Sequence, residues 1–254
     1  MKYKIKLSTV TTYKFGGYCN NFYKISNNDI DLFDEAFSNK EYFILGKGSN
    51  VAFSDKDYEG NVINPDFNEI SFIKNLGEVK VGSSVFLPDI ARFYKDKNLI
   101  NAEFLIGIPG SVGGAVKMNA GAYGWEFSDI LSSIEVYNLV TKKIETLDKD
   151  DLNFSYRSSS NLENKVIISA TLIGTEGDPA LIKSRLKENI KYRKDTQPSA
   201  IYNAGSVFKN TDQYSAGELI DKAGLKGFSI DGVRASSKHA NFFVASKGAS
   251  SSSL

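Results

Sequence analysis

The sequence predicts an α+β fold, in which short strands are combined with a few helices. Short apolar runs such as Val62–Ile63 and Val79–Val81 are separated by Asn, Gly and Pro, which is typical of strands joined by tight turns. The charged segment Pro179–Arg193 has the apolar spacing of a helix. Composition changes near residue 176, which favours two smaller domains over one large one.

The N-terminal half is expected to be rich in strands. The expected elements are a short strand in the first ten residues, a short helix at Asp31–Ser38, a strand at Tyr42–Leu45, the runs Val62–Ile63, Ile70–Phe72 and Val79–Val81, and an amphipathic helix Leu87–Lys97 ending at Asn98.

Beyond residue 125 the pattern predicts a hairpin and a long strand. Ile130–Tyr137 and Lys143–Leu147 flank a turn at residues 138–141, and Val166–Ile173 is a continuous apolar run. Between them, Asp151–Arg157 looks strand-like. A loop rich in Pro, Ser, Asn and Gly follows the helical segment, at Thr196–Ser206.

Composition argues against several classes of partner. The 254 residues carry 31 Lys and Arg against 30 Asp and Glu, a formal net charge of +1 with no evident basic patch, so neither nucleic acid nor an anionic membrane is expected as a partner. Cys19 and His239 are the only cysteine and histidine, so we expect no disulfide framework and no metal site. The N-terminus lacks the apolar core of a signal peptide, which predicts a cytoplasmic protein.

The stretch Glu103–Trp125 is the most distinctive part of the chain. It holds six glycines, at positions 107, 110, 113, 114, 121 and 124, interleaved with small side chains. Without Cβ atoms, successive backbone N–H groups can point at one place, and such a cradle suits a diphosphate. A set of ordinary tight turns is the alternative, and the number of glycines favours ligand binding.

A second small-residue turn, Gly46–Asn50, follows the strand predicted at Tyr42–Leu45. It offers backbone amides and two short polar side chains to phosphate or ribityl oxygens. It is not the dinucleotide fingerprint G-x-G-x-x-G, because the third Gly is missing and Val51–Phe53 looks like a strand. Alone, it would be read as a turn.

Three further segments could carry chemistry. Arg157 could neutralise a carboxylate or a developing enolate, although a surface ion pair is the simpler interpretation of Tyr156–Arg157 alone. Ser206 could donate a proton to a carbanion with help from a cation or a water chain. With one distant histidine and no local G-x-S-x-G, a hydrolase triad is poorly supported. We interpret His239 as a hydrogen-bonded structural residue.

The order of these segments resembles the MurB family of UDP-N-acetylenolpyruvoylglucosamine reductases, also called UDP-N-acetylmuramate dehydrogenases. The resemblance runs from about Thr11 to the last residues, and its motifs here are LGKGSNVAFSD, EFLIGIPGSVGGAVKMNAGAYG, FSYRSS, DTQPSAIYNAGSVFKN, AGELIDKAGLKG and SKHANFFV. The Gly-rich stretch followed by YRSS and GSVFKN is specific to this family, whereas GKGSN is shared with a wider set of flavin oxidases and dehydrogenases.

The resemblance implies a vanillyl-alcohol-oxidase-like, PCMH-type FAD-binding domain at residues 1–176, with subdomains at about 1–60 and 61–176. A small α/β substrate-binding domain would follow at 177–254. It further implies that NADPH reduces a non-covalently bound FAD, which then passes hydride to UDP-N-acetylglucosamine enolpyruvate to give UDP-N-acetylmuramate for peptidoglycan synthesis. We expect a monomer.

The resemblance also assigns site residues. Arg157 would stabilise the enolate-like intermediate and Ser206 would protonate the adjacent carbon, while Lys194 and Asn210 would contact the uridine diphosphate. The residues expected to bind FAD are Gly46, Lys47, Gly48, Ser49, Asn50, Ile108, Pro109, Gly110, Ser111, Gly113, Gly114, Ala115 and Asn119.

This sequence departs from the family pattern at its C-terminal end. A further catalytic Glu of the family has no counterpart, because no acidic residue follows Asp231, and we expect that the chain is truncated. Lesser departures are Thr211 in place of proline and Lys14–Phe15 in the N-terminal motif. The spacing after Tyr156 matches the shorter subclass. Two alternatives remain, namely another FAD oxidase or dehydrogenase of the superfamily, and an impaired homologue that only binds nucleotide.

Overall fold

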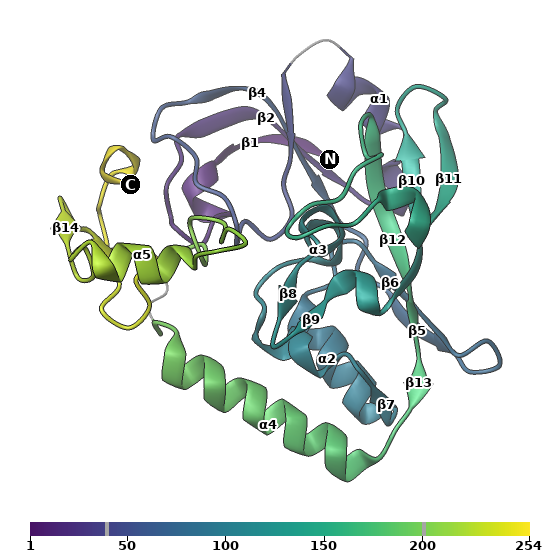
Figure 1. The fold of residues 1–254 in the computed structure, drawn as a ribbon. Helices are drawn as coiled ribbons and strands as arrows, with labels where there is room; N and C mark the ends of the chain where they lie inside the picture. The colour runs from purple at the N-terminus through teal and green to yellow at the C-terminus, as the bar shows by residue number, and fades with distance from the viewer. Residues whose placement is uncertain (39–40, 200–201) are drawn as a thin grey trace. The chain divides into compact units, whose positions relative to one another are not determined.

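The computed structural model describes residues 1–38, 41–199 and 202–254, and the chain forms two compact units (Figure 1). Each unit is assembled from separate stretches of sequence. The first unit comprises Met1–Lys2, Tyr23–Lys47 and Asn61–Lys191, and the second comprises Tyr3–Phe22, Gly48–Gly60 and Tyr192–Leu254. The domain boundaries expected from the sequence stay a prediction.

A five-stranded antiparallel sheet is the centre of the first unit. Its order is β11-β10-β12-β6-β5, with bounds Lys143–Asp148, Leu131–Asn138, Lys165–Ile173, Glu78–Gly82 and Ile70–Ile73. The predicted hairpin is confirmed, since the Asn138 side-chain oxygen accepts hydrogen bonds from the N–H groups of Val140 and Thr141 and so closes the turn between β10 and β11.

A four-stranded sheet has the order β1-β2-β4-β3. Its strands are β1 (Lys2–Lys6), β2 (Tyr18–Ile25), β4 (Tyr58–Pro65) and β3 (Tyr42–Ile44), and β3 pairs with β4 in parallel. The smaller pairings are β7 (Leu99–Ile100) with β13 (Thr175–Glu176), β8 (Gly121–Ala122) with β9 (Trp125–Glu126), and β14 (Ser229–Ile230), β15 (Val233–Ala235) and β16 (Phe243–Ala245) in one sheet.

The α-helices lie close to where the periodicity places them, with two additions. Their bounds are α1 (Leu32–Phe37), α2 (Leu87–Asp96), α3 (Val112–Met118), α4 (Pro179–Thr196) and α5 (Ala216–Lys222). The predicted helices at residues 31–38, 87–97 and 179–193 are confirmed as α1, α2 and α4. The sequence pattern does not indicate α3 or α5, because both are short and glycine weakens their helical pattern.

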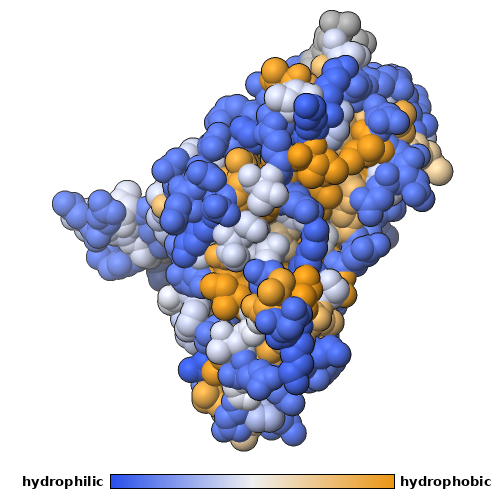
Figure 2. Space-filling model, turned by 90° about the vertical axis from the view of Figure 1, so that its right-hand side faces the viewer, coloured by the Kyte–Doolittle hydropathy of each residue, from blue (hydrophilic) through white to orange (hydrophobic). Residues whose placement is uncertain are grey.

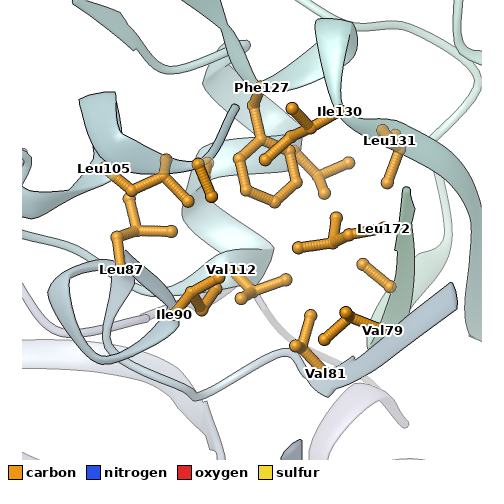
Figure 3. Close-up of a cluster of buried hydrophobic side chains, with 14 of the residues drawn as sticks. Val79, Val81, Leu87, Ile90, Leu105, Val112, Phe127, Ile130, Leu131 and Leu172 are labelled. Atoms are coloured by element: carbon orange, nitrogen blue, oxygen red, sulfur yellow. The ribbon is translucent and has the colours of Figure 1, made fainter. Parts of the chain in front are cut away.

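The main hydrophobic core fills the space between the five-stranded sheet, α2 and α3 (Figure 3). Val79 and Leu172 contribute from neighbouring strands, and Ile90 and Val112 contribute from the two helices. Phe127, which is completely buried, projects into the same cluster. This packing holds the Gly-rich segment of residues 103–125 against the sheet.

Two strand predictions are wrong. Residues 51–53 have no regular secondary structure, although their apolar pattern suggested a strand. The segment 151–157 begins in the 3-10 helix Lys149–Leu152, continues through Asn153 in the left-handed region with φ 39°, and ends in a turn closed by an isolated bridge between Ser155 and Ser158. Asp148 and Asp151 form a capping box there, and these local side-chain bonds compete with strand pairing. Part of the loop predicted at Thr196–Ser206 lies outside the described residues.

Polar and charged residues cover most of the face seen in Figure 2, and apolar residues appear there as separate patches. Exposed apolar residues are found in both units, among them Val140 and Phe208. In the part of the chain that the structure describes, the search for a helix with the length and apolar character of a membrane span finds none.

Replacing Phe127 by Ala should lower the free energy of unfolding by about 3–5 kcal/mol, because the variant loses a fully buried ring and leaves a cavity. Urea denaturation followed by circular dichroism measures this loss. Val140→Ala is the control, since Val140 is 74% exposed and should change stability by no more than about 0.5 kcal/mol. Equal effects of the two substitutions would contradict the assignment of the core.

Candidate functional site

The Gly-rich segment folds into a short helix between two turns. Residues Glu103–Gly107 form a 3-10 helix, the chain turns at Gly110, and α3 begins at Val112. At the other end Asn119 adopts the left-handed conformation with φ 41°, and the N–H of Ala120 donates to the carbonyl of Ala115. This closure of α3 is the usual way in which a left-handed residue ends a helix.

The start of α3 presents backbone donors. The N–H of Gly113 donates to the carbonyl of Ser83 at 2.8 Å, whereas the N–H groups of Gly110, Ser111 and Gly114 have no hydrogen-bond partner among the described residues. The Ser83 hydroxyl is buried and likewise has no partner there. Clustered donors of this kind suit an anion, and they agree with the diphosphate cradle predicted from the glycines.

The two Gly-rich loops approach each other at Gly46. A Cβ built on Gly46 would overlap the Ser111 hydroxyl, and one built on Gly114 would lie 3.6 Å from the same oxygen. A side chain at Gly46 would therefore fill the space beside the backbone donors of Gly110 and Ser111. The residues present fit a diphosphate, because the missing side chains leave the backbone accessible.

In the second unit, Gly48 is fixed by the N-terminal segment. Its φ is +66°, and a Cβ there would overlap the carbonyl oxygen of Val10. Thr12 donates from its N–H and from its hydroxyl to the Gly48 carbonyl, at 3.0 and 3.2 Å. The conformation of the Gly46–Asn50 loop thus depends on a glycine at position 48. The roles of Lys47, Ser49 and Asn50 in cofactor binding stay predictions.

Arg157 lies in a tight turn and is held by three acceptors. Ser155 and Ser158 exchange backbone hydrogen bonds of 3.1 Å around it, and Arg157 itself has φ 53°. Its Nη1 donates to the Asn119 carbonyl at 3.1 Å and its Nη2 to the Gly121 carbonyl at 2.7 Å. Nη1 also approaches Glu126 Oε1 at 3.3 Å.

The three contacts leave two N–H donors of the Arg157 guanidinium available. A guanidinium has five N–H donors, so Nε–H and one Nη2–H have no hydrogen-bond partner among the described residues. The side chain is 30% exposed, and the Tyr156 ring lies 5.0 Å from Cζ. Arg157 therefore does form the ion pair that the dipeptide alone suggested, and it also presents two donors that could bind a carboxylate.

Asn119, predicted to bind cofactor, is part of this network. Its Nδ2 donates to Glu126 Oε2 at 2.7 Å and to the Ser155 carbonyl at 3.1 Å, and its Oδ1 accepts from the N–H of Ser128. The side-chain amide is thus engaged within the protein. Glu126 was not among the predicted site residues. The one feature of the sequence that could have pointed to it is that no other acidic residue lies between Glu103 and Asp129.

Ser206, Lys194 and Asn210 belong to the second unit, whereas Arg157 belongs to the first. Ser206 is exposed and pairs through an isolated β-bridge with Phe242. Asn210 Oδ1 accepts from the N–H of Ala216, at the start of α5. The Lys194 carbonyl accepts a hydrogen bond from the side chain of Lys238.

Asn241 fixes the segment that carries Ser206. Its side chain, which is 2% exposed, accepts from the N–H of Phe208 and donates to the carbonyl of the same residue. The N–H of Val207 donates to the Asn241 carbonyl at 2.9 Å. The backbone on the C-terminal side of Ser206 is therefore held by three hydrogen bonds to one buried residue.

His239 packs beside this segment. Its ring lies 4.7 Å from the Phe242 ring, and burial lowers the pKa of the imidazole, with a smaller contribution from the charge of Lys226. Nδ1 is buried and has no hydrogen-bond partner among the described residues. The expectation of a hydrogen-bonded side chain is therefore wrong for Nδ1, and the tilted contact with the Phe242 ring is the interaction found for the imidazole.

A cavity of about 190 Å³ lies in the first unit. Its lining combines three aromatic residues with polar and charged ones: Asn101, Glu103, Phe104, Tyr123, Trp125, Arg185 and Asn189. None of the predicted site residues is among them. In the described ranges there is also no cluster of three or more His, Cys, Asp or Glu placed to hold a metal ion.

Comparison with known families divides the chain into two matched regions. Residues 35–147 match the family described as FAD binding domain. Residues 197–254 match the family described as UDP-N-acetylenolpyruvoylglucosamine reductase, C-terminal domain.

Named relatives cover nearly the whole chain. A UDP-N-acetylenolpyruvoylglucosamine reductase from Orientia tsutsugamushi is 39% identical over 98% of this chain and 84% of its own length. One from Prochlorococcus marinus is 37% identical over 96% of this chain and 84% of its length. The crystal structure of the MurB enzyme from Thermus caldophilus superposes with a TM-score of 0.89 at 30% identity, over 100% of this chain and 91% of that one.

Gly48→Ala should release FAD and destabilise the protein, because alanine at φ +66° is strained and its Cβ would overlap a backbone oxygen. The absorbance ratio of bound flavin to protein and the thermal midpoint measure the two effects. Gly124→Ala is the matched control, since φ is +82° there but the added Cβ meets nothing within 4 Å. Equal flavin content in the two variants would argue against a binding role for the Gly48 loop.

His239 should make stability depend on pH below about 6.5. Its folded-state pKa lies below the unfolded value of about 6.5, so the unfolded chain binds the proton more readily and stability falls as pH falls below that value. His239→Gln should flatten this part of a plot of thermal midpoint against pH, because it removes the only histidine. Parallel plots for both proteins would show that His239 is not responsible.

Proposed function

The chain belongs to the family of UDP-N-acetylenolpyruvoylglucosamine reductases, and we propose from this premise that it reduces UDP-N-acetylglucosamine enolpyruvate to UDP-N-acetylmuramate with electrons from NADPH. It is a FAD-dependent oxidoreductase with an FAD-binding domain and the C-terminal domain of this family. The proposal places it in the cytoplasm as a monomer that supplies a peptidoglycan precursor, and hence in cell-wall biogenesis, cell shape and division.

The arrangement of Arg157 is the observation that carries the proposal. Three acceptors fix its guanidinium, and two of its N–H donors remain for a ligand. A planar pair of donors matches the two oxygens of a carboxylate. The carboxylate of the enolpyruvyl group is where negative charge grows when hydride adds to the vinyl carbon, so a positioned guanidinium there would bind the developing enolate more strongly than the substrate.

Ser206 has the role of proton donor in this proposal. After hydride has added to the vinyl carbon, the adjacent carbon must receive a proton to give the lactyl ether. A serine hydroxyl has a high pKa, so the transfer needs a nearby cation or a water chain to stabilise the alkoxide. The hydrogen bonds between Asn241 and residues 207–208 support this role, because they restrict the backbone next to Ser206.

The remaining predicted residues would bind cofactor and substrate. Residues 46–50, the turn at 108–111 and the start of α3 would hold the FAD diphosphate and ribityl chain through backbone N–H groups. When bound, FAD would supply the chemistry of hydride transfer between NADPH and the substrate. Lys194 and Asn210 would contact the uridine diphosphate, where Lys194 offers a positive charge to the phosphates.

An anaerobic absorbance experiment tests the function. NADPH should bleach the flavin of the purified chain, and UDP-N-acetylglucosamine enolpyruvate should then restore the flavin absorbance. Bleaching by NADPH that the enolpyruvyl compound cannot reverse would contradict the proposed reaction. Bleaching by an alcohol or sugar in place of NADPH would instead identify an oxidase of the wider superfamily.

Ser206→Ala should leave NADPH-driven flavin reduction unchanged while slowing reoxidation by the enolpyruvyl substrate by about 10²–10⁴-fold, since only the second half-reaction needs the proton. Stopped-flow absorbance measures both half-reactions separately. Val207→Ala is a suitable control, because the neighbouring exposed side chain has no proton to donate. Equal slowing of both half-reactions by Ser206→Ala would contradict the assigned role.

A further inference from the structure

Glu126 joins Arg157 to Asn119 in a closed ring of contacts. Its Oε1 lies 3.3 Å from Arg157 Nη1, and its Oε2 accepts from Asn119 Nδ2 at 2.7 Å. The ring closes because the Asn119 carbonyl accepts a second hydrogen bond from Nη1 of Arg157, at 3.1 Å. Each of the three residues is thereby held by the other two.

The backbone on both sides of the ring is also fixed. The N–H of Glu126 donates to Asp129 Oδ2 at 2.8 Å, and Asn119 accepts from the N–H of Ser128. Glu126 ends β9, whose partner β8 supplies the Gly121 carbonyl that binds Nη2 of Arg157. The acceptors of Arg157 therefore come from one short hairpin and from the residue that ends α3.

We propose that Glu126 is a positioning residue that sets the direction of the Arg157 guanidinium for reduction of the enolpyruvyl group. The inference rests on the proposed function, and Glu126 is not among the residues that the sequence motifs assign to the site. Glu126 itself need not touch substrate. It acts by accepting from Arg157 at one oxygen and from Asn119 at the other.

A carboxylate is the side chain that suits this place. Both neighbours approach Glu126 as donors, an amide N–H of Asn119 and a guanidinium N–H of Arg157. Glutamine has one acceptor oxygen and one NH₂ group, so its NH₂ would face one of the two donors. Glu126→Gln is therefore nearly isosteric but breaks the ring at one of its contacts.

The contribution of the Arg157–Glu126 ion pair to the stability of the fold is too small to explain why the pair is there. The Arg157 and Glu126 side chains are 30% and 35% exposed, and ion pairs of such exposure contribute at most about 1 kcal/mol. A carboxylate next to Arg157 also opposes the binding of a second anion. Removing the charge should thus leave substrate affinity the same or higher, whereas loss of orientation should slow the reaction. A merely structural residue would not separate these two effects.

The test compares Glu126→Gln with Glu135→Gln. Glu135 is a matched control, because its side chain is 34% exposed and its two oxygens likewise accept from two partners, Lys80 and Ser169, away from Arg157. Stopped-flow absorbance gives the rates of flavin reduction by NADPH and of reoxidation by the enolpyruvyl substrate. Calorimetry gives the dissociation constant of the same substrate from the oxidised enzyme.

We expect Glu126→Gln to slow reoxidation by about tenfold or more, to leave NADPH-driven reduction unchanged and not to weaken substrate binding. Glu126→Asp, which keeps the charge, should recover part of the rate. In an Arg157→Gln background, Glu126→Gln should have no further effect, because it acts through the guanidinium. Glu135→Gln should behave as the parent enzyme.

Two results would overturn the inference. One is equal reoxidation rates for Glu126→Gln and Glu135→Gln, and the other is a full additional loss from Glu126→Gln in the Arg157→Gln background. Failure of the proposed function is separate from both. It would appear in the parent enzyme itself, as reduced flavin that the enolpyruvyl substrate cannot reoxidise.

Discussion

The candidate site depends on the three hydrogen bonds that fix the Arg157 guanidinium. It requires the carbonyls of Asn119 and Gly121 to converge on one point. Asn119 turns the chain sharply at the end of α3, and a Cβ at Gly121 would lie 3.1 Å from Arg157 Nη1. Backbone geometry that only a few residue types tolerate is thus what places the charged group.

The same reliance on short-range geometry appears in the second unit. Asn241 binds the backbone of residues 207–208 as a neighbouring strand would, and this leaves the exposed Ser206 on a fixed segment. In both units the side chain that we propose to be catalytic is carried by a loop, and buried or partly buried amides hold that loop in place. Such support is what a catalytic group on a loop needs, because small displacements cost rate.

The long apolar strands, the hairpin with its turn at residues 138–141, and helices α1, α2 and α4 followed from the pattern of apolar, charged and turn-forming residues in the sequence. Helix α3 did not, because glycine-rich sequence signals turns more strongly than helix. The strand expected before Arg157 failed for a related reason, as the aspartates there form a capping box. Glu126 was not predicted, because its partner Arg157 lies 31 positions further along the chain and no local pattern links them.

The reoxidation rate of reduced Arg157→Lys by the enolpyruvyl substrate is the most direct test of this account. Lysine keeps the positive charge but cannot satisfy three acceptors and offer a planar pair of donors as well. We expect normal flavin reduction by NADPH and reoxidation slowed by about 10²–10³-fold, the usual cost of losing an oriented donor to developing charge. Reoxidation at the parent rate would show that charge alone suffices and would contradict the central role given to the fixed guanidinium.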